Sequence, residues 1–387
     1  MIARSLFLFL LLIIIPHLYV DYRYRHKSKL WKRILLWIPT LAMLAFTIYL
    51  AMEKDFIPNN PILIYTYLFI LGFIFIPKAV FALCSAIGWG WRKLFKRRRN
   101  YANLIGVLAI PVIWYILIYG SFVGFNKMEV NYQTFACEDL PKALEGYRIV
   151  QFSDAHVGTY TKSNQWVLQR AVDSINALKP DLIVFTGDLQ NTQPQDIYIH
   201  MDILGSLKAK DGVYAVLGNH DYAEYVGGDE VKKVANCRET ISLERQMGWN
   251  LLLNEHRVID RDSIHFVIAG MENDGDGKKF PQKGDINQTL DGVSEKDFIL
   301  MLEHDPSAWR RKIIPDGRAQ LTLSGHTHKM QFALFGWCPM TLTGKEVNGW
   351  YHEGRQSLYV SAGLGGLIPF RFGATGEIVV ITLTNNH

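Results

Sequence analysis

Four long apolar stretches in the first 126 residues constrain the fold of this chain more than any other feature. Residues 5–20, 34–52 and 101–125 contain no Lys, Arg, Asp or Glu, and residues 61–91 contain a single charge, Lys78. About 20 apolar residues in a helix cross the ~30 Å hydrocarbon core of a bilayer. Residues 1–126 are therefore predicted to form an all-α transmembrane region of about four helices. Lys78 is expected to face a neighbouring helix or to extend toward the membrane surface.

Basic residues are concentrated in two of the connections between these spans. Residues 22–33 (YRYRHKSKLWKR) and 91–99 (WRKLFKRRR) carry six Lys or Arg each, whereas residues 53–60 carry one. Loops rich in Lys and Arg stay on the cytoplasmic side of a membrane. The pattern predicts a multi-pass membrane protein in contact with the lipid bilayer, whose chain after Phe125 lies on the non-cytoplasmic, periplasmic or extracellular side. A cleaved signal peptide is not indicated, because no small-residue cleavage site follows the first apolar stretch.

The remainder of the chain has the opposite charge balance. Residues 1–126 hold 15 Lys and Arg against 3 Asp and Glu, while residues 127–387 hold 26 against 33, a net charge of −7. The excess positive charge thus belongs to the membrane region, and no nucleic-acid partner is expected for the acidic part. We expect residues 127–146 to be a linker and residues 147–387 to form a separate domain.

Polar residues follow short strand-like runs five times in this second part. Each run is rich in Val, Ile, Leu or Phe and ends abruptly in Asp, Asn or His. Because residues 164–178 show helical spacing between two of these runs, strands alternating with helices are predicted, which is the pattern of an α/β fold. Ligands bind beyond the carboxyl ends of such strands, so these side chains should converge. They are Asp154 and His156, then Asp188, then Asn219, His220 and Asp221, then His304, and last His326 and His328.

Each of these residues alone has an ordinary explanation, such as a turn aspartate or a buried histidine. Their recurrence at five strand ends instead favours a metal site. Carboxylates, an amide and imidazoles without a thiolate suit Mn, Fe or Zn better than Mg or Ca. The set exceeds the capacity of one ion, and two divalent metal ions sharing a carboxylate account for it. Such a dinuclear centre activates water for phosphoryl displacement.

Five motifs resemble, in their order and spacing, those of the calcineurin-like metallophosphoesterases. They are DAH at 154–156, GDLQN at 187–191, GNHD at 218–221, HDP at 304–306 and GHTH at 325–328. The layout resembles the membrane-anchored branch, which includes bacterial membrane-associated phosphodiesterases and vertebrate transmembrane proteins with the same domain. The resemblance covers residues 147–383 and implies a four-layer α/β/β/α sandwich. It also implies hydrolysis of a phosphate monoester, diester or pyrophosphate.

The same resemblance implies a role for each motif residue. The first metal would be held by Asp154, His156, Asp188 and His328. The second would be held by Asp188, Asn219, His304 and His326, with Asp188 as the bridge. His220 would stabilise the phosphate and protonate the leaving oxygen, and Asp221 would orient His220 and keep it protonated.

Two further residues are candidates for substrate binding. Lys329, at the mouth of the expected site, stands with Met330 where many relatives have two glycines. Arg371, in a Gly-rich turn, either holds substrate phosphate or pairs with an acid. The aromatic residues Phe335, Trp337 and Phe370 are expected in the core rather than at a membrane interface.

The function favoured by these patterns is a membrane-anchored phosphoesterase acting on a phosphate ester, lipid-linked because four spans hold the site near the bilayer. A nucleotide or nucleic-acid phosphodiesterase is the alternative within the enzymes. A non-catalytic membrane receptor or scaffold is the alternative outside them, although such a protein would be expected to lose ligands or His220, and all are present.

Overall fold

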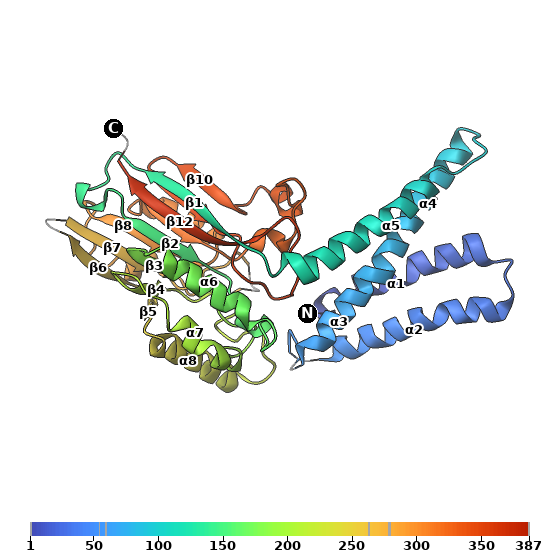
Figure 1. Cartoon of the computed structure of the whole chain (residues 1–387), viewed down its shortest axis with the longest axis horizontal. Helices are drawn as coiled ribbons and strands as arrows, with labels where there is room; N and C mark the ends of the chain where they lie inside the picture. The colour runs from blue at the N-terminus through green and yellow to red at the C-terminus, as the bar shows by residue number, and fades with distance from the viewer. Residues whose placement is uncertain (1, 54, 59, 262–263, 278–279, 386–387) are drawn as a thin grey trace. The chain divides into compact units, whose positions relative to one another are not determined.

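The computed structural model describes residues 2–53, 55–58, 60–261, 264–277 and 280–385. The chain forms two compact units, Met1–Phe122 and Val123–His387 (Figure 1). We call the first the membrane unit and the second the catalytic unit.

Among the described residues, four helical segments are long and apolar enough to span a bilayer, which confirms the predicted number: Ile2–Arg25, Leu30–Met52, Pro61–Leu94 and Ala102–Gly124. Within these segments the α-helices are α1 (Leu6–Val20), α2 (Leu30–Met52), α3 (Pro61–Ile70), α4 (Ile76–Leu94) and α5 (Ala102–Tyr119). Short wider π-helical turns complete them at Asp21–Arg25, Leu71–Phe75 and Gly120–Gly124.

Polar groups inside the membrane unit are bonded to one another. Pro77 lacks the N–H that would bond to the carbonyl of Phe73, and the indole Nε1 of Trp114 donates to that carbonyl at 2.8 Å instead. Lys78 faces α1, where its Nζ lies 3.2 Å from Nδ1 of His17. These contacts supply partners that lipid tails do not offer.

The catalytic unit is built on two six-stranded sheets. The first has the order β1-β12-β2-β3-β4-β5, and the second has the order β10-β11-β9-β8-β7-β6. The strands of the first sheet are β1 (Met128–Ala136), β2 (Arg148–Phe152), β3 (Leu182–Phe185), β4 (Val213–Ala215), β5 (Asn250–Leu251) and β12 (Gly376–Thr384). Those of the second are β6 (Glu255–Arg261), β7 (Ile264–Gly270), β8 (Phe298–Leu302), β9 (Leu321–Ser324), β10 (Gly349–Glu353) and β11 (Gln356–Val360).

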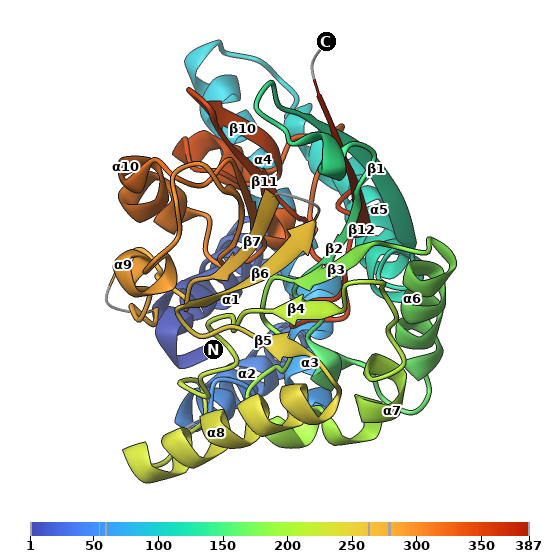
Figure 2. The ribbon, with the colours of Figure 1, turned by 90° about the vertical axis from the view of Figure 1, so that its left-hand side faces the viewer.

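Three apolar layers hold the sheets and helices together. Alternate residues of β2 face opposite sides: Ile149 packs between the two sheets, whereas Val150 and Phe152 pack under the helices of the first sheet. Those helices are α6 (Gln165–Ala177), α7 (Met201–Leu204) and α8 (Glu230–Gln246). Near the outer face of the second sheet lie α9 (Ile286–Thr289), α10 (Ile314–Asp316) and the turn Trp309–Ile313, whose Trp309 joins the core there (Figure 2). This arrangement is the expected four-layer α/β/β/α sandwich.

Residues 127–146, expected to be a linker, instead contribute a strand to the fold. β1 pairs in parallel with β12 along its whole length, from Met128 beside Gly376 to Ala136 beside Thr384. The prediction was wrong because the partner strand, β12, lies at the other end of the chain, and no local pattern in the sequence indicates this pairing.

Candidate metal centre

The expected ligands lie just beyond the carboxyl ends of five strands. β2, β3 and β4 run parallel to one another in the first sheet, and β8 and β9 run parallel in the second. Asp154 and His156 follow β2, Asp188 follows β3, Asn219 follows β4, His304 follows β8, and His326 and His328 follow β9. Both sheets therefore supply side chains to one place, which is where open α/β sheets bind ligands.

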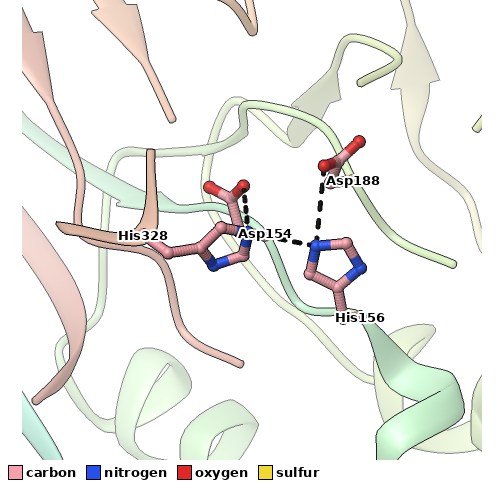
Figure 3. Close-up of side chains that lie close together, drawn as sticks. All are labelled: Asp154, His156, Asp188 and His328. Carbon is pink, nitrogen blue, oxygen red and sulfur yellow. Dashed lines mark hydrogen bonds and ion pairs between the residues drawn. The ribbon is translucent and has the colours of Figure 1, made fainter. Parts of the chain in front are cut away.

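One group of four side chains forms the first half of the site. One ligand atom from each of Asp154, His156, Asp188 and His328 lies within 4.8 Å of the others (Figure 3). His156 Nε2 lies 3.2 Å from His328 Nε2 and 3.5 Å from an oxygen of Asp188, and His328 Nε2 lies 3.3 Å from an oxygen of Asp154. These atoms point inward at a common centre.

A second group shares one member with the first. Ligand atoms of Asp188, His304 and His326 also lie within 4.8 Å of one another. The side-chain oxygen of Asn219 lies 2.8 Å from His326 Nδ1 and 3.2 Å from His304 Nε2, while its nitrogen donates to Tyr225 at 2.9 Å. Asp188 thus stands between two adjacent sets of ligands.

The chemistry of these donors fits bound cations. Burial lowers the pKa of His156 well below the usual histidine value and lowers the pKa of His328 to about 4. Both imidazoles are therefore neutral at pH 7, and their Nε2 atoms approach to 3.2 Å. His304 Nδ1 lies 2.7 Å from the Thr186 carbonyl, so that Nε2 faces an oxygen of Asp188 at 3.3 Å. Burial lowers the pKa of His304, but the Asp188 carboxylate raises it well above the usual histidine value, so a cation at Nε2 would take the place of a proton. A cation between the His156 and His328 lone pairs would remove their repulsion.

The backbone at the ligands is strained. Five of the proposed ligands adopt positive φ angles, which few non-glycine residues do. Each such residue costs of order 1–3 kcal/mol and persists only where the surroundings impose it. The strain supports a functional role for these positions: the φ angles are 51° for Asp154, 43° for His156, 62° for Asp188, 75° for His326 and 51° for His328.

Glycine allows the two sheets to approach closely at Asp154. A Cβ atom at Gly325, just before His326, would collide with the Asp154 carboxylate. A Cβ at Gly363 would lie 2.7 Å from the Asp154 Cβ. The glycine in the GHTH motif is therefore required by packing against Ser153 and Asp154.

The structure corrects the expected partnership of His220 and Asp221. The Asp221 carboxylate accepts hydrogen bonds from four backbone N–H groups, those of Gly218, Asp188, Leu189 and Gln190, at 2.8–3.1 Å. His220 Nδ1 instead lies 2.5 Å from the carbonyl oxygen of Asn191. Asp221 therefore fixes the loop that carries Asp188, and Asn191 orients His220. Burial lowers the pKa of His220, contrary to the expectation that a charge pair keeps it protonated.

Arg371 is placed differently from a substrate-binding arginine. Its guanidinium is buried and donates to the backbone carbonyls of Ala362, Gly363, Gly365 and Ala374. The backbone N–H of Gly365 in turn donates to the Asp154 carbonyl at 3.0 Å. The side chain was expected to bind phosphate or pair with an acid, and it holds a loop beside a proposed ligand instead.

Lys329 lies at the edge of the site and is half-buried. In the part of the chain that the structure describes, no carboxylate lies within ion-pair distance of its Nζ. Its charge is therefore available to an anion.

Supporting residues were missed in the sequence. Asp305 places a carboxylate oxygen 3.5 Å from His326 Nε2, opposite the Nδ1 atom that faces Asn219. The Tyr225 ring lies 4.4 Å from the His220 ring, measured between centroids. Asp305 stands in the HDP motif and could have been noticed there, whereas Tyr225 has no such signal.

Comparison with known proteins agrees with this geometry. Residues 147–330 match the family model "Calcineurin-like phosphoesterase", and residues 3–125 match "Probable Calcineurin-like phosphoesterase, transmembrane domain". The metallophosphoesterase YkuE of Bacillus subtilis is 31% identical over 306 residues, which cover 76% of this chain and all of that protein. A transmembrane protein with a metallophosphoesterase domain from Danio rerio is 29% identical over 335 residues, 82% of this chain and 71% of that one.

A third relative has a named activity. The UDP-2,3-diacylglucosamine pyrophosphatase LpxG of Chlamydia trachomatis is 29% identical over 341 residues, covering 72% of this chain and 96% of that protein. The fold, the cluster of metal-ligand side chains and the four spans together define a membrane-anchored phosphoester hydrolase. The chain belongs to the calcineurin-like phosphoesterase family.

Proposed function

We propose that the catalytic unit binds two divalent metal ions and hydrolyses a phosphate ester or pyrophosphate linked to a lipid. The main support for this proposal is the position of Asp188, whose carboxylate belongs to both ligand groups. A first ion would be held by Asp154, His156, Asp188 and His328. A second would be held by Asp188, Asn219, His304 and His326. Mn, Fe and Zn suit this set of oxygen and imidazole ligands.

A metal pair supplies an activated water and stabilises the charge of the transferring phosphoryl group. The chain supplies the rest. His220 stands at the site, with its Nδ1 held by the Asn191 carbonyl and its backbone N–H donating to Asp188 at 2.8 Å. Its other ring nitrogen would contact the phosphate, whose negative charge would favour the protonated imidazole, and His220 would then give that proton to the leaving oxygen. Lys329 would bind a phosphate oxygen from the mouth of the site.

The membrane unit favours a substrate in the lipid phase. Four spans confine the catalytic unit to the bilayer surface, where amphiphilic phosphate esters are concentrated. The relative LpxG acts, by its name, on a diacylated sugar nucleotide containing a pyrophosphate. The basic connections at 22–33 and 91–99 favour a catalytic unit on the non-cytoplasmic side. Residues 1–126 then serve as the anchor, and the remainder carries the chemistry.

The test uses the full chain purified in detergent. Two equivalents of transition metal per chain are expected, together with hydrolysis of bis(4-nitrophenyl) phosphate that a chelator abolishes. A panel of a diacylated sugar pyrophosphate, a nucleotide diester and single-stranded DNA then separates the substrate classes. A preference for the nucleotide or DNA would overturn the lipid assignment. One metal per chain would overturn the dinuclear assignment, and a metal-loaded chain without activity would indicate a receptor.

A further inference from the structure

An exposed apolar segment begins two residues after the last proposed ligand, His328. We call residues 330–342 the apolar lip. Its most exposed side chains are Phe335 at 107%, Leu342 at 79% and Trp337 at 46%. Met330 and Leu334 are exposed as well. Phe335 and Trp337 were expected in the core, and the structure places them on the surface.

The tip of the lip is a turn in which a large aromatic residue is costly. Leu334 and Trp337 exchange backbone hydrogen bonds of 2.8 and 3.0 Å across Phe335 and Gly336, whose φ angles are 51° and 83°. Such turns favour Asn, Asp or Gly at both central positions. A side chain in this conformation is destabilising because its Cβ approaches the following carbonyl oxygen, and Phe335 gains no burial in return. Stability of the folded unit therefore does not explain a phenylalanine here.

The base of the lip is firmly held. The backbone N–H of Ala333 donates to Phe372 at 2.7 Å, and the N–H of Phe372 donates to Gln331 at 2.9 Å. Ala333 and Cys338 are buried in a small core with Val347 and Ala374. The exposed aromatic residues therefore project from a fixed base.

The lip stands where the metal centre opens to solvent. The side chains of His326 and His328 are 22% and 16% exposed, whereas those of Asp154 and His156 are fully buried. The open side of the centre is thus formed by the segment that continues into the lip.

The chain enters the catalytic unit at the same end. Phe125 is buried against Tyr160, with ring centroids 5.6 Å apart, and Tyr160 follows the ligand His156 by four residues. Only Phe125, Asn126 and Lys127 separate the helical turn ending at Gly124 from β1. The attachment to the membrane therefore lies on the ligand-bearing side of the sandwich.

Hydrogen bonds connect this entry point to the lip. Thr159, next to Tyr160, donates through Oγ1 to the Gly366 carbonyl at 2.8 Å. The side-chain nitrogen of Gln331, at the base of the lip, donates to the carbonyls of Ile368 and Phe370 at 2.9 and 2.7 Å. The loop 366–370 thus joins the two, and entry point, metal centre and lip share one face.

We propose that the apolar lip inserts into the interfacial layer of the bilayer that anchors the chain and holds the mouth of the metal centre at the level of the lipid headgroups. A phosphate attached to a lipid then reaches the centre without its acyl chains entering water. This inference rests on the proposed function for its benefit to catalysis, although insertion itself is measured independently.

The lipid surface is the occupant that fits these observations. Trp prefers the interface between headgroups and acyl chains, and Phe and Leu are typical of apolar faces buried there. Lys329 adjoins the lip with a charge suited to anionic headgroups, whereas Lys345 beyond its other end is paired with Asp276. The chain joins the membrane unit from this face, through Phe125–Lys127. A second copy of the chain is the competing occupant, which the experiment distinguishes.

Insertion is tested by photocrosslinking on the full chain in phosphatidylcholine vesicles containing anionic phosphatidylglycerol. Benzoylphenylalanine replaces Phe335 in one variant and Val258 in the other, an exposed apolar residue in the middle of the edge strand β6. Illumination should attach lipid covalently to the first variant and not to the second. Mass spectrometry of the protein detects the adduct. Absence of lipid adducts at position 335, or crosslinks there to a second chain, would overturn the proposal.

The catalytic consequence is tested with two diesters that share one leaving group. Ethyl 4-nitrophenyl phosphate is soluble, and hexadecyl 4-nitrophenyl phosphate resides in the vesicles. The variant Phe335→Ser/Trp337→Ser/Leu342→Ser should hydrolyse the hexadecyl ester at least about tenfold more slowly, the factor given by ~1.4 kcal/mol of lost lip–lipid contact. Its rate with the ethyl ester should stay unchanged.

The two experiments separate the possible failures. If the unaltered chain hydrolyses neither ester, the proposed function is wrong, while lipid adducts at position 335 would still establish insertion. If the triple variant loses both activities equally, the crosslinking result alone decides. If the triple variant hydrolyses the two esters in the same ratio as the unaltered chain, and position 335 forms no lipid adducts, insertion of the apolar lip is refuted.

Discussion

The backbone N–H of His326 lies 3.0 Å from each carboxylate oxygen of Asp154. This contact joins the end of β9 in the second sheet to the end of β2 in the first, and so it fixes the distance between the two halves of the metal centre. Asp154 has two tasks as a result: its carboxylate serves as a proposed ligand and also tethers the turn that carries two more.

Replacing Asp154 with Asn tests both tasks. The amide can no longer offer two acceptor oxygens to the His326 N–H, and it lacks the charge that favours a cation. We expect loss of one metal per chain and a lower free energy of unfolding by about 1–3 kcal/mol. Metal analysis and thermal unfolding measure these effects. Asp173→Asn, an exposed carboxylate on α6 that bonds to Gln169 at 2.9 Å, is the matched control. Retention of two metals would remove Asp154 from the ligand set.

Asp188→Ala should have a different signature. Because its carboxylate belongs to both groups, its loss should lower metal content at both positions rather than at one. The same metal analysis, run beside Asp154→Asn, shows the difference. Full occupancy in the Asp188 variant would contradict its role as a bridge.

His220→Ala should leave the metal content near that of the unaltered chain. Loss of a general acid lowers kcat by ~10²–10⁴-fold, and the loss should shrink for good leaving groups such as nitrophenol, which need no proton. Rates across a series of phenyl esters measure this slope. His326→Ala is the contrasting variant, expected to lose metal and all substrates alike. Equal losses across the series with missing metal in the His220 variant would make His220 a ligand.

Arg371→Lys should weaken the loop beside Asp154. Lysine has fewer donors than the planar guanidinium and cannot bond to four carbonyls at once. We expect a loss of at least about 2 kcal/mol in unfolding free energy and weaker binding of the first metal, with activity restored by excess metal. Arg355→Lys, an exposed arginine paired with Asp139, is the control. Unchanged metal affinity, with a raised KM alone, would return Arg371 to a role in substrate binding.

The orientation in the membrane is tested by a reporter at the C-terminus. The two basic connections predict that this end lies outside the cytoplasm, so a periplasmic or extracellular reporter should be active there. Moving the basic residues of 91–99 to the opposite connection should lower that signal. A cytoplasmic signal from the unaltered chain would contradict the proposed side.

Much of the centre was predictable because strand ends in α/β sheets converge. In the sequence Asp154, Asp188 and His326 each follow a short apolar run. The parallel arrangement of the strands then brings these three side chains to the same edge of the sheets. The spans were predictable for a similar reason, since the bilayer thickness dictates their length. In both cases one strong physical rule acts on a local pattern.

Other features depended on partners that no local pattern reveals. Asp221 stands beside His220 in the chain, yet its carboxylate bonds to backbone N–H groups, which every residue type except proline has. Arg371 likewise bonds to backbone carbonyls, which every residue has, so the sequence does not reveal its partners. The positive φ angles of His156 and His328 arise from tertiary packing and leave no trace in residue identity. The sequence also did not predict the exposure of Phe335, because an aromatic residue near a site is usually buried.

The strand β1 begins four residues after the last membrane helix turn and pairs fully with β12. A protease cutting within residues 137–146 would leave β12 as a nine-residue edge strand rich in Ile and Val, a template for aggregation. Cleavage there would also strip Phe125 from the core. Shedding of a soluble, working enzyme therefore demands a cut before Phe125, in the last turn of the membrane helix itself.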